Sequence, residues 1–185
     1  MKTAMISLAA VLGIFVLVAV FCVGSYINAY NYGNSTEAQI KAEYSNMENI
    51  LGQYSLKVAE AAQVPAAYRD DLKTVVSAAM TGRYGQDGSK AVFQFIKEQN
   101  VQVDSSVYKQ LQQTIEGGRN QFENSQTKFI DVKRVYETNL GSFWTGTWLK
   151  VAGYPKINLA EFKLISSEHA QDTFKTGVDK GLKIR

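Results

Sequence analysis

Thiol and imidazole groups are scarce in this chain, which holds one cysteine, Cys22, and one histidine, His169, among its 185 residues. A single thiol excludes a disulfide framework. Because Cys22 lies inside an apolar run, no cluster of soft ligands for zinc or another transition metal remains. A Ser-His-acid triad would need His169, which lies in a charged tail where a solvated side chain is expected. We therefore predict no catalytic, cofactor-binding or metal-binding residues and no enzymatic activity.

A marked excess of one charge sign is also missing. The net charge is +3, from 20 Lys and Arg against 17 Asp and Glu, and the two signs are interspersed. Nucleic-acid binding needs a basic stripe, so we predict no nucleic-acid partner. The carboxylates of Asp70 and Asp71, and of Asp131 and Glu137, are expected on solvated helix faces rather than as acid and base pairs. Residues 82–90 have the wrong spacing for a phosphate loop, and we expect a turn between helices there.

The chain does contain one long hydrophobic run. Residues 4–24 are 21 residues without a charge, and Ser7 is their one clearly polar side chain. A helix needs about 20 such residues to cross a hydrocarbon core about 30 Å thick. The run is apolar on all sides, which excludes a helix lying in the interface. Its length and the bulky residues at 20–23 favour a retained anchor, with a cleaved signal peptide as the alternative. Phe21 before Cys22 favours a buried, inert thiol over lipid attachment.

The charges that flank this run predict its orientation. Lys2 and the amino terminus precede it, whereas no charged residue follows until Glu37 and no cation until Lys41. An excess of positive charge favours the cytoplasmic side of a membrane. We therefore predict a single-pass membrane protein whose bulk lies in the periplasm or otherwise outside the cytoplasm.

The rest of the chain has helical periodicity, which predicts an all-α fold: an N-terminal transmembrane helix followed by an antiparallel bundle of long helices. We expect an anchor over residues 1–28, a bundle over 29–155 and a C-terminal tail over 156–185. The first bundle helix is predicted to restart at Asn34 after a weak point at Gly33, because Asn34 and Glu37 resemble a capping box. Pro65 is expected to end this helix or to open the next.

A seam of apolar residues in this first helix has alternating steps of four and three, which are typical of heptad positions. Its members are Ile40, Tyr44, Met47, Leu51, Tyr54, Val58 and Ala61. Such a seam packs either inside the bundle, which we favour, or against another copy of the chain.

Three further helices are expected. The first covers 66–82, with Tyr68, Leu72, Val75 and Ala79 on its apolar side. The second covers 89–99, with Val92, Phe95 and Ile96. The longest runs from an N-cap at Asp104 to Leu140. Its apolar and small positions are Val107, Leu111, Ile115, Gly118, Phe122, Ser125, Phe129, Val132, Tyr136 and Leu140. Gly117 and Gly118 each cost about 1 kcal/mol inside a helix, which predicts either a close helix crossing or a kink.

Aromatic residues gather after this helix. Phe143, Trp144 and Trp148 are expected in a turn that packs across the end of the bundle. Contact of Trp144 and Trp148 with the bilayer surface is the alternative, because tryptophan favours the membrane–water interface. The tail from Ile157 is expected to be solvated and weakly ordered.

The order of these features resembles the LemA family. The resemblance is carried by the N-terminal span, an exit rich in Asn and Tyr at residues 26–31, and the first and last long helices. The family's last helix repeats a Tyr-Asn pattern that leads to a Phe-Pro end. The corresponding positions here are Phe129, Val132, Tyr136, Leu140 and Phe143. Phe129 replaces a tyrosine, Trp144 replaces the proline, and the family's arginine pair on the first helix is missing, so the chain resembles a divergent branch such as LemA-like proteins of phages or their hosts.

The resemblance implies an antiparallel bundle on a membrane anchor and brings no established catalytic activity. These observations favour a non-enzymatic, membrane-anchored scaffold or interaction protein. Its expected partners are the lipid bilayer, further copies of the chain and another membrane protein. The alternative is a periplasmic regulatory module, such as an antiholin-type regulator of phage lysis, which would share the single span and the compact outer domain.

Overall fold

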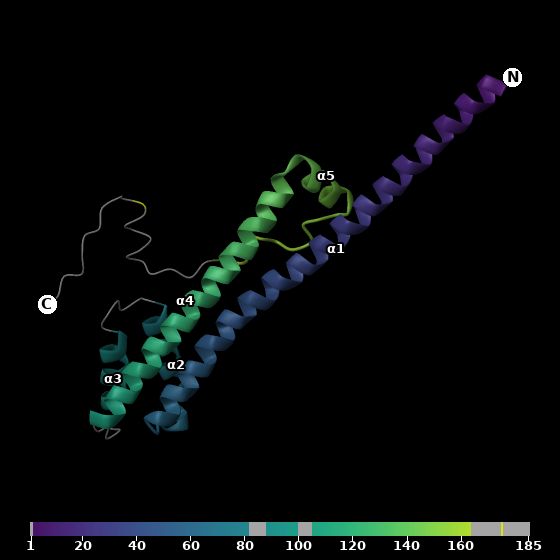
Figure 1. Ribbon diagram of the computed structural model, residues 1–185. Coiled ribbons are helices and arrows are strands. Elements are labelled where there is room, and N and C mark those ends of the chain that lie inside the picture. Colours follow the sequence, from purple (N-terminus) through teal and green to yellow (C-terminus); the bar gives the residue numbers. More distant parts are fainter. Residues whose placement is uncertain (1, 82–87, 100–104, 164–174, 176–185) are drawn as a thin grey trace. The chain divides into compact units, whose positions relative to one another are not determined.

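The computed structural model describes residues 2–81, 88–99, 105–163 and 175. Every helix or strand assigned in these ranges is a helix, so the predicted all-α fold is confirmed. In chain order the elements are α1 (Lys2–Ala61), the short 3₁₀ helix η1 (Ala66–Tyr68), α2 (Arg69–Met80), α3 (Gly88–Glu98), α4 (Ser105–Gly141) and α5 (Phe143–Val151) (Figure 1). Of the turn predicted over 82–90, residues 82–87 lie outside the described residues, as do the predicted N-cap Asp104 and His169. Residues 88–90 belong to α3, so the predicted turn is wrong there.

The chain divides into two compact units. Unit 1 comprises Met1–Ala42 and Asp131–Phe162, and unit 2 is built on Glu43–Ile130. Unit 1 thus contains the first part of α1, the end of α4 and the whole of α5. Unit 2 contains the rest of α1 and α4 together with α2 and α3.

The first helix of unit 1 corrects one prediction. α1 continues through Gly33 without a break, so the predicted restart at Asn34, with its capping box to Glu37, is wrong. A Cβ atom at Gly33 would lie 2.7 Å from the ring of Tyr154. Gly33 therefore lets this ring pack against the α1 backbone, and tertiary packing overrides the weak helix propensity of glycine.

Replacing Gly33 with alanine is expected to destabilise unit 1. The new Cβ would stand within 2.8 Å of three ring atoms of Tyr154, so the ring must move. We expect a net loss of about 2 kcal/mol, even though alanine is the better helix former. Thermal unfolding of the full chain in detergent measures the effect, with Gly24→Ala as the control because nothing lies within 4 Å of that position. Equal unfolding temperatures for the two variants would show that the Tyr154 ring has room to move.

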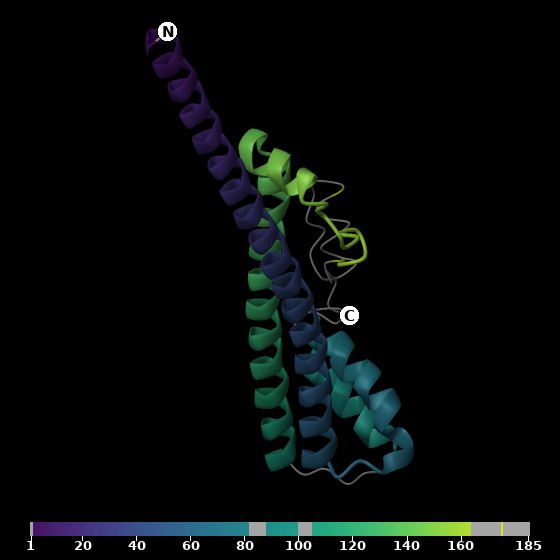
Figure 2. The same ribbon diagram turned by 90° about the vertical axis from the view of Figure 1, so that its right-hand side faces the viewer.

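The end of unit 1 corrects a second prediction, because residues 143–151 form the helix α5 and not a turn. Ser142 is its N-cap, with a hydroxyl that accepts a hydrogen bond from the Gly146 amide at 3.2 Å. A Cβ at Gly146 would collide with the carbonyl oxygen of Leu140, so this glycine allows α5 to fold back closely over the end of α4. Both views show α5 beside α1 (Figures 1 and 2). A small core joins these helices: Ala29, Leu149, Ala152 and Tyr154, flanked by Tyr32, Leu140 and Trp148.

Unit 2 is packed around the inner face of α4. Leu111, Ile115 and Phe122 are buried there, as the periodicity predicted. On α2 the buried residues are Leu72, Val76, Ala79 and Met80. Of the predicted inner positions, Leu72 and Ala79 are confirmed and Val75 is half-buried. Tyr68 is wrong: it is exposed and belongs to the tighter turn of η1, outside the repeat of α2. On α3, Val92 and Ile96 are buried and Phe95 is half-buried.

The paired glycines of α4 lie at a close approach in unit 2. A Cβ at Gly118 would lie 2.7 Å from Cε of Met80 and 2.8 Å from the Tyr54 ring, whereas one at Gly117 would meet only the Tyr54 hydroxyl at 3.9 Å. α4 remains one helix across both residues. Of the two alternatives drawn from the sequence, the close crossing is the one observed, and it depends on Gly118.

Candidate functional site

A buried carboxylate connects three segments of unit 1. Glu37 on α1 is 5% exposed, and its Oε1 accepts a hydrogen bond of 2.7 Å from the hydroxyl of Tyr136 on α4. The same oxygen accepts the backbone amide of Lys156 at 2.7 Å and that of Ile157 at 3.5 Å. We call these four residues the Glu37 junction. It joins α1, α4 and the segment that follows α5.

The phenol of Tyr136 is a donor in this junction. Burial, and then the hydrogen bond to Glu37, raise the pKa of Tyr136 well above its usual value of 10.0. Ionisation would place a second negative charge beside the Glu37 carboxylate in a poorly solvated position. Tyr136 therefore keeps its proton at neutral pH and holds Glu37 in place, which is a structural role.

The raised pKa of Tyr136 predicts a loss of stability at high pH. Above pH 10.0, the usual pKa, the unfolded chain releases the proton that the folded chain retains, so stability falls as pH rises. Below that pH the contribution is fully present. Comparing the unfolding free energy of the wild type and Tyr136→Phe should give a difference that changes by about 1.4 kcal/mol per pH unit above that point. Denaturant titrations across this range measure it, and parallel pH profiles would contradict the assignment.

The segment after α5 is tied to unit 1 by cations as well as by Glu37. Nζ of Lys156 lies over the rings of Tyr30 and Tyr154, at 4.6 and 4.4 Å from their centroids. Its interaction with the Tyr154 side chain raises the pKa of Lys156. Lys133 donates to the carbonyl oxygens of Leu159 and Phe162 at 2.9 and 3.0 Å. Residues 156–162, the start of the predicted tail, thus make specific contacts with α1 and α4 inside unit 1.

A small cavity lies near the N-terminal end of α5, also within unit 1. It has a volume of about 200 Å³ and is lined by Ser25, Asn28, Ala29, Tyr32, Asn139, Trp144, Thr145 and Trp148. The Asn139 amide donates to the Tyr32 hydroxyl at 2.5 Å, and the two indoles meet edge to face at 6.0 Å. The walls offer amide, hydroxyl and aromatic groups and no carboxylate, so the cavity is built for packing or neutral contacts and not for acid–base chemistry.

The predicted seam is largely covered by the chain itself. Ile40, Met47 and Val58 are buried, and Tyr44, Leu51 and Tyr54 are half-buried. Within unit 2, the Tyr44 ring packs on Phe129 with centroids 5.6 Å apart, and the Tyr54 hydroxyl donates to Gln121 at 2.9 Å. These side chains therefore have partners within the chain.

The positions carried by the family resemblance separate into two groups. Phe129 and Tyr136 are fully buried, and Val132 and Leu140 are half-buried, all on the inner face of α4. Phe143 opens α5 and is 89% exposed. Only Tyr136 of this set takes part in the Glu37 junction.

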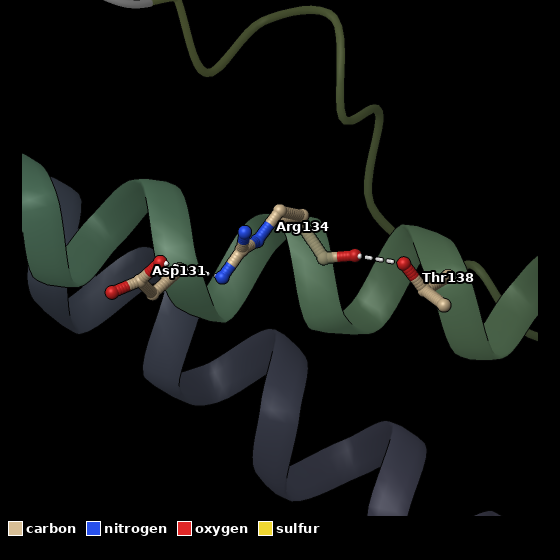
Figure 3. A network of polar contacts seen from close by, with 3 residues as sticks. All are labelled: Asp131, Arg134 and Thr138. Atoms are coloured by element: carbon tan, nitrogen blue, oxygen red, sulfur yellow. Dashed lines mark hydrogen bonds and ion pairs between the residues drawn. The ribbon is translucent and has the colours of Figure 1, made fainter.

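The acidic residues noted in the sequence lie on the surface. Asp131 pairs with Arg134 at 3.0 Å along the exposed side of α4, and the Arg134 carbonyl accepts from Thr138 (Figure 3). An exposed pair of this kind contributes about 0.5 kcal/mol. Asp70 and Asp71 occupy the first turn of α2, where the helix dipole favours negative charge. In the part of the chain that the structure describes, no group of three or more His, Cys, Asp or Glu side chains is placed to hold a metal.

Glu37 is the site residue that the sequence analysis assigned to the wrong role. The seam could have been extended backwards from Ile40 by steps of three and four, which gives Glu37, then Gly33, then Ala29, and all of these are buried. A charged residue on the inner face of a helix needs a partner. The need for a partner was the signal in the sequence that could have identified Glu37 as a site residue.

Comparison with protein-family models, with curated proteins and with solved structures finds no match for this chain.

Proposed function

We propose that the chain is a single-pass membrane protein that acts as a non-enzymatic scaffold or interaction protein, with α1 as its anchor. The observation that carries the proposal is the exposure of the apolar run. The most apolar 18-residue stretch of α1 has a mean hydropathy of 3.0, and none of it is buried by the described residues. Phe15, for example, is 71% exposed. A continuous apolar surface of this size needs a cover, and its length suits a bilayer.

The order of contacts supports the proposed antiparallel arrangement of the long helices. In unit 1, Tyr32 pairs with Asn139 and Glu37 with Tyr136. The residue number of the α4 partner therefore falls as that of the α1 partner rises, so the two segments run in opposite directions. In unit 2 the same holds for Asn46 with Ser125 and Tyr54 with Gln121. Side chains of α1 and α4 thus hold together the part of the chain that follows the span, as expected of a folded body on a membrane anchor. Membership of a LemA-like family remains a prediction from the sequence.

Membrane integration and orientation test the proposal together. We expect the full-length chain to stay in the membrane fraction after alkaline carbonate extraction. Reporters fused after Arg185 should be active outside the cytoplasm and silent inside it, as Lys2 predicts. A shortened, carbonate-soluble chain would identify residues 4–24 as a cleaved signal and would overturn the anchor. A retained anchor with a cytoplasmic reporter signal would reverse only the orientation.

Self-association of the chain is tested separately. The seam residues already have partners within the chain, so this association would use a surface other than the seam. We expect light scattering of the detergent-solubilised protein to give a mass above that of one chain, with the fraction of oligomer rising with concentration. A single-chain mass at every concentration would remove self-association. Proximity labelling from the C-terminus in cells would then remain the test for a second membrane protein as partner.

A further inference from the structure

We propose that the N-terminal end of α5 inserts into the membrane–water interface beside α1, so that the protein holds the bilayer at a second point, through Phe143 and Trp144. This inference rests on the proposed function, since it takes α1 to be in the membrane. It assigns a lipid contact to a surface outside the span.

The surface concerned is one face of α5. Its exposed residues are Phe143, Trp144, Thr147, Lys150 and Val151, which follow helical spacing. The opposite face, with Gly146 and Leu149, is buried against unit 1. Three of the five exposed side chains are large and apolar, with Phe143 89% and Trp144 54% exposed. Removing these aromatic groups from water would lower the free energy, so this face favours an apolar cover.

Contact with the span fixes the depth of this face. The ring of Trp144 meets that of Phe21 on α1, with centroids 5.8 Å apart. Residues 4–24 rise about 30 Å as a helix, which matches the hydrocarbon core. Phe21 lies three residues before the end of this run, or about 5 Å along the axis. Trp144 is therefore placed near the boundary between acyl chains and headgroups, where tryptophan is enriched in membrane proteins.

The neighbouring residues have the composition of an interfacial belt. On α1, Tyr26 and Tyr30 follow the span, both with exposed rings 6.4 Å apart. On α5, Lys150 lies on the same exposed face as Phe143 and Trp144, where its long side chain can reach lipid phosphates. Aromatic residues at the boundary and lysine beyond it are the arrangement that anchors a helix in the interface.

A bilayer fits this face better than a second copy of the chain, because the apolar surface of α5 continues through Phe21 into the exposed apolar surface of α1. Any cover for residues 6–23 that is a bilayer must extend to the height of Trp144. A protein partner on the exposed face of α5 would have to bind without displacing the lipid that covers α1 next to Trp144.

The test uses the two native tryptophans, Trp144 and Trp148, in the full chain reconstituted into phosphatidylcholine vesicles. Trp144→Phe changes an exposed ring and leaves Trp148 as the remaining fluorophore, so subtracting its emission from that of the wild type isolates Trp144. Lipids brominated near the carbonyl end of the acyl chains are expected to lower the Trp144 emission about twofold, and lipids brominated near the chain end to lower it less. Phe15→Trp in the Trp144→Phe background is the positive control, since it should be quenched most by the deep bromines.

The outcomes separate the two levels of the proposal. Flotation with the vesicles, checked first, reports on α1: a chain that does not float loses the proposed anchor itself. A chain that floats, with Trp144 quenched by aqueous iodide and not by bromolipids, keeps the anchor and overturns the insertion of α5. A third outcome is Trp144 emission that neither quencher lowers and that becomes typical of a water-exposed tryptophan only when the protein is diluted in lipid. It would assign the face to contact with a second copy and would also overturn the proposal.

Discussion

Replacing Glu37 with alanine is expected to cost unit 1 about 3 kcal/mol of stability. The substitution removes the acceptor of the Tyr136 hydroxyl and of the Lys156 amide, each at 2.7 Å. Tyr136 is fully buried, so its hydroxyl would be left without that partner in a dry position. The segment 156–162 would also lose its hydrogen bonds to Glu37 and keep those of Lys133 and the contact of Lys156 with Tyr30. Hydrogen exchange of the full chain in detergent measures the effect, with faster exchange expected in the peptides that cover residues 154–162.

The matched control is Glu37→Gln, which keeps the shape of the side chain and one carbonyl oxygen as an acceptor. We expect a smaller loss, of about 1 kcal/mol, since a neutral acceptor makes weaker hydrogen bonds than a charged one. Peptides of unit 2, such as those from α2, serve as the internal reference and should exchange at wild-type rates in both variants. Equal losses in the two variants would show that a neutral acceptor holds the segment no better than alanine does, and wild-type exchange in both would contradict the role assigned to the Glu37 carboxylate.

Periodicity was enough to predict the inner face of α4. Leu111, Ile115, Phe122, Phe129 and Tyr136 follow steps of four and seven, and all are buried. The reason is physical: one helix of 37 residues keeps its phase, and an amphipathic repeat then defines its buried side. The same argument failed at Tyr68, because this residue lies in the 3₁₀ turn of η1 before α2 begins.

Sequence reasoning was wrong where glycine and acidic residues serve tertiary contacts. Gly33 has the local signature of a helix break, yet it admits the ring of Tyr154, which is 121 residues away in the sequence. Glu37 looks like the last residue of a capping box, yet it holds Tyr136 and Lys156. Local propensity contains no information about such distant partners, so these roles follow only from the fold.

The aromatic segment 143–151 shows a third kind of limit. Its two threonines, its glycine and its aromatic residues are moderate to poor helix formers, so local propensity does not predict a helix there. The structure makes it helical because Ser142 caps it and because Gly146 lets it lie close to the Leu140 carbonyl. The bilayer contact of Trp144, first raised as the alternative to packing, then acquires a defined face and a defined neighbour in Phe21.

The adjacent glycines of α4 should respond to alanine in opposite directions. Gly117→Ala is expected to stabilise unit 2 by about 1 kcal/mol, because the new methyl group meets nothing closer than the Tyr54 hydroxyl at 3.9 Å and improves helix propensity. Gly118→Ala is expected to destabilise it by about 2 kcal/mol, because the methyl group would lie 2.7 Å from Met80 and 2.8 Å from the Tyr54 ring.

The sign at Gly118 depends on which neighbour can move. Cε of Met80 is the end of a flexible side chain and can turn away at small cost. The Tyr54 ring is held more firmly, since its hydroxyl donates to Gln121 at 2.9 Å and Lys57 lies 4.4 Å above its centroid. Urea denaturation of each full-length variant, followed by far-ultraviolet circular dichroism, should therefore separate the two by about 3 kcal/mol. Adding Tyr54→Leu to Gly118→Ala should restore part of the loss if the ring is the obstacle, and no restoration would leave Met80 as the obstacle.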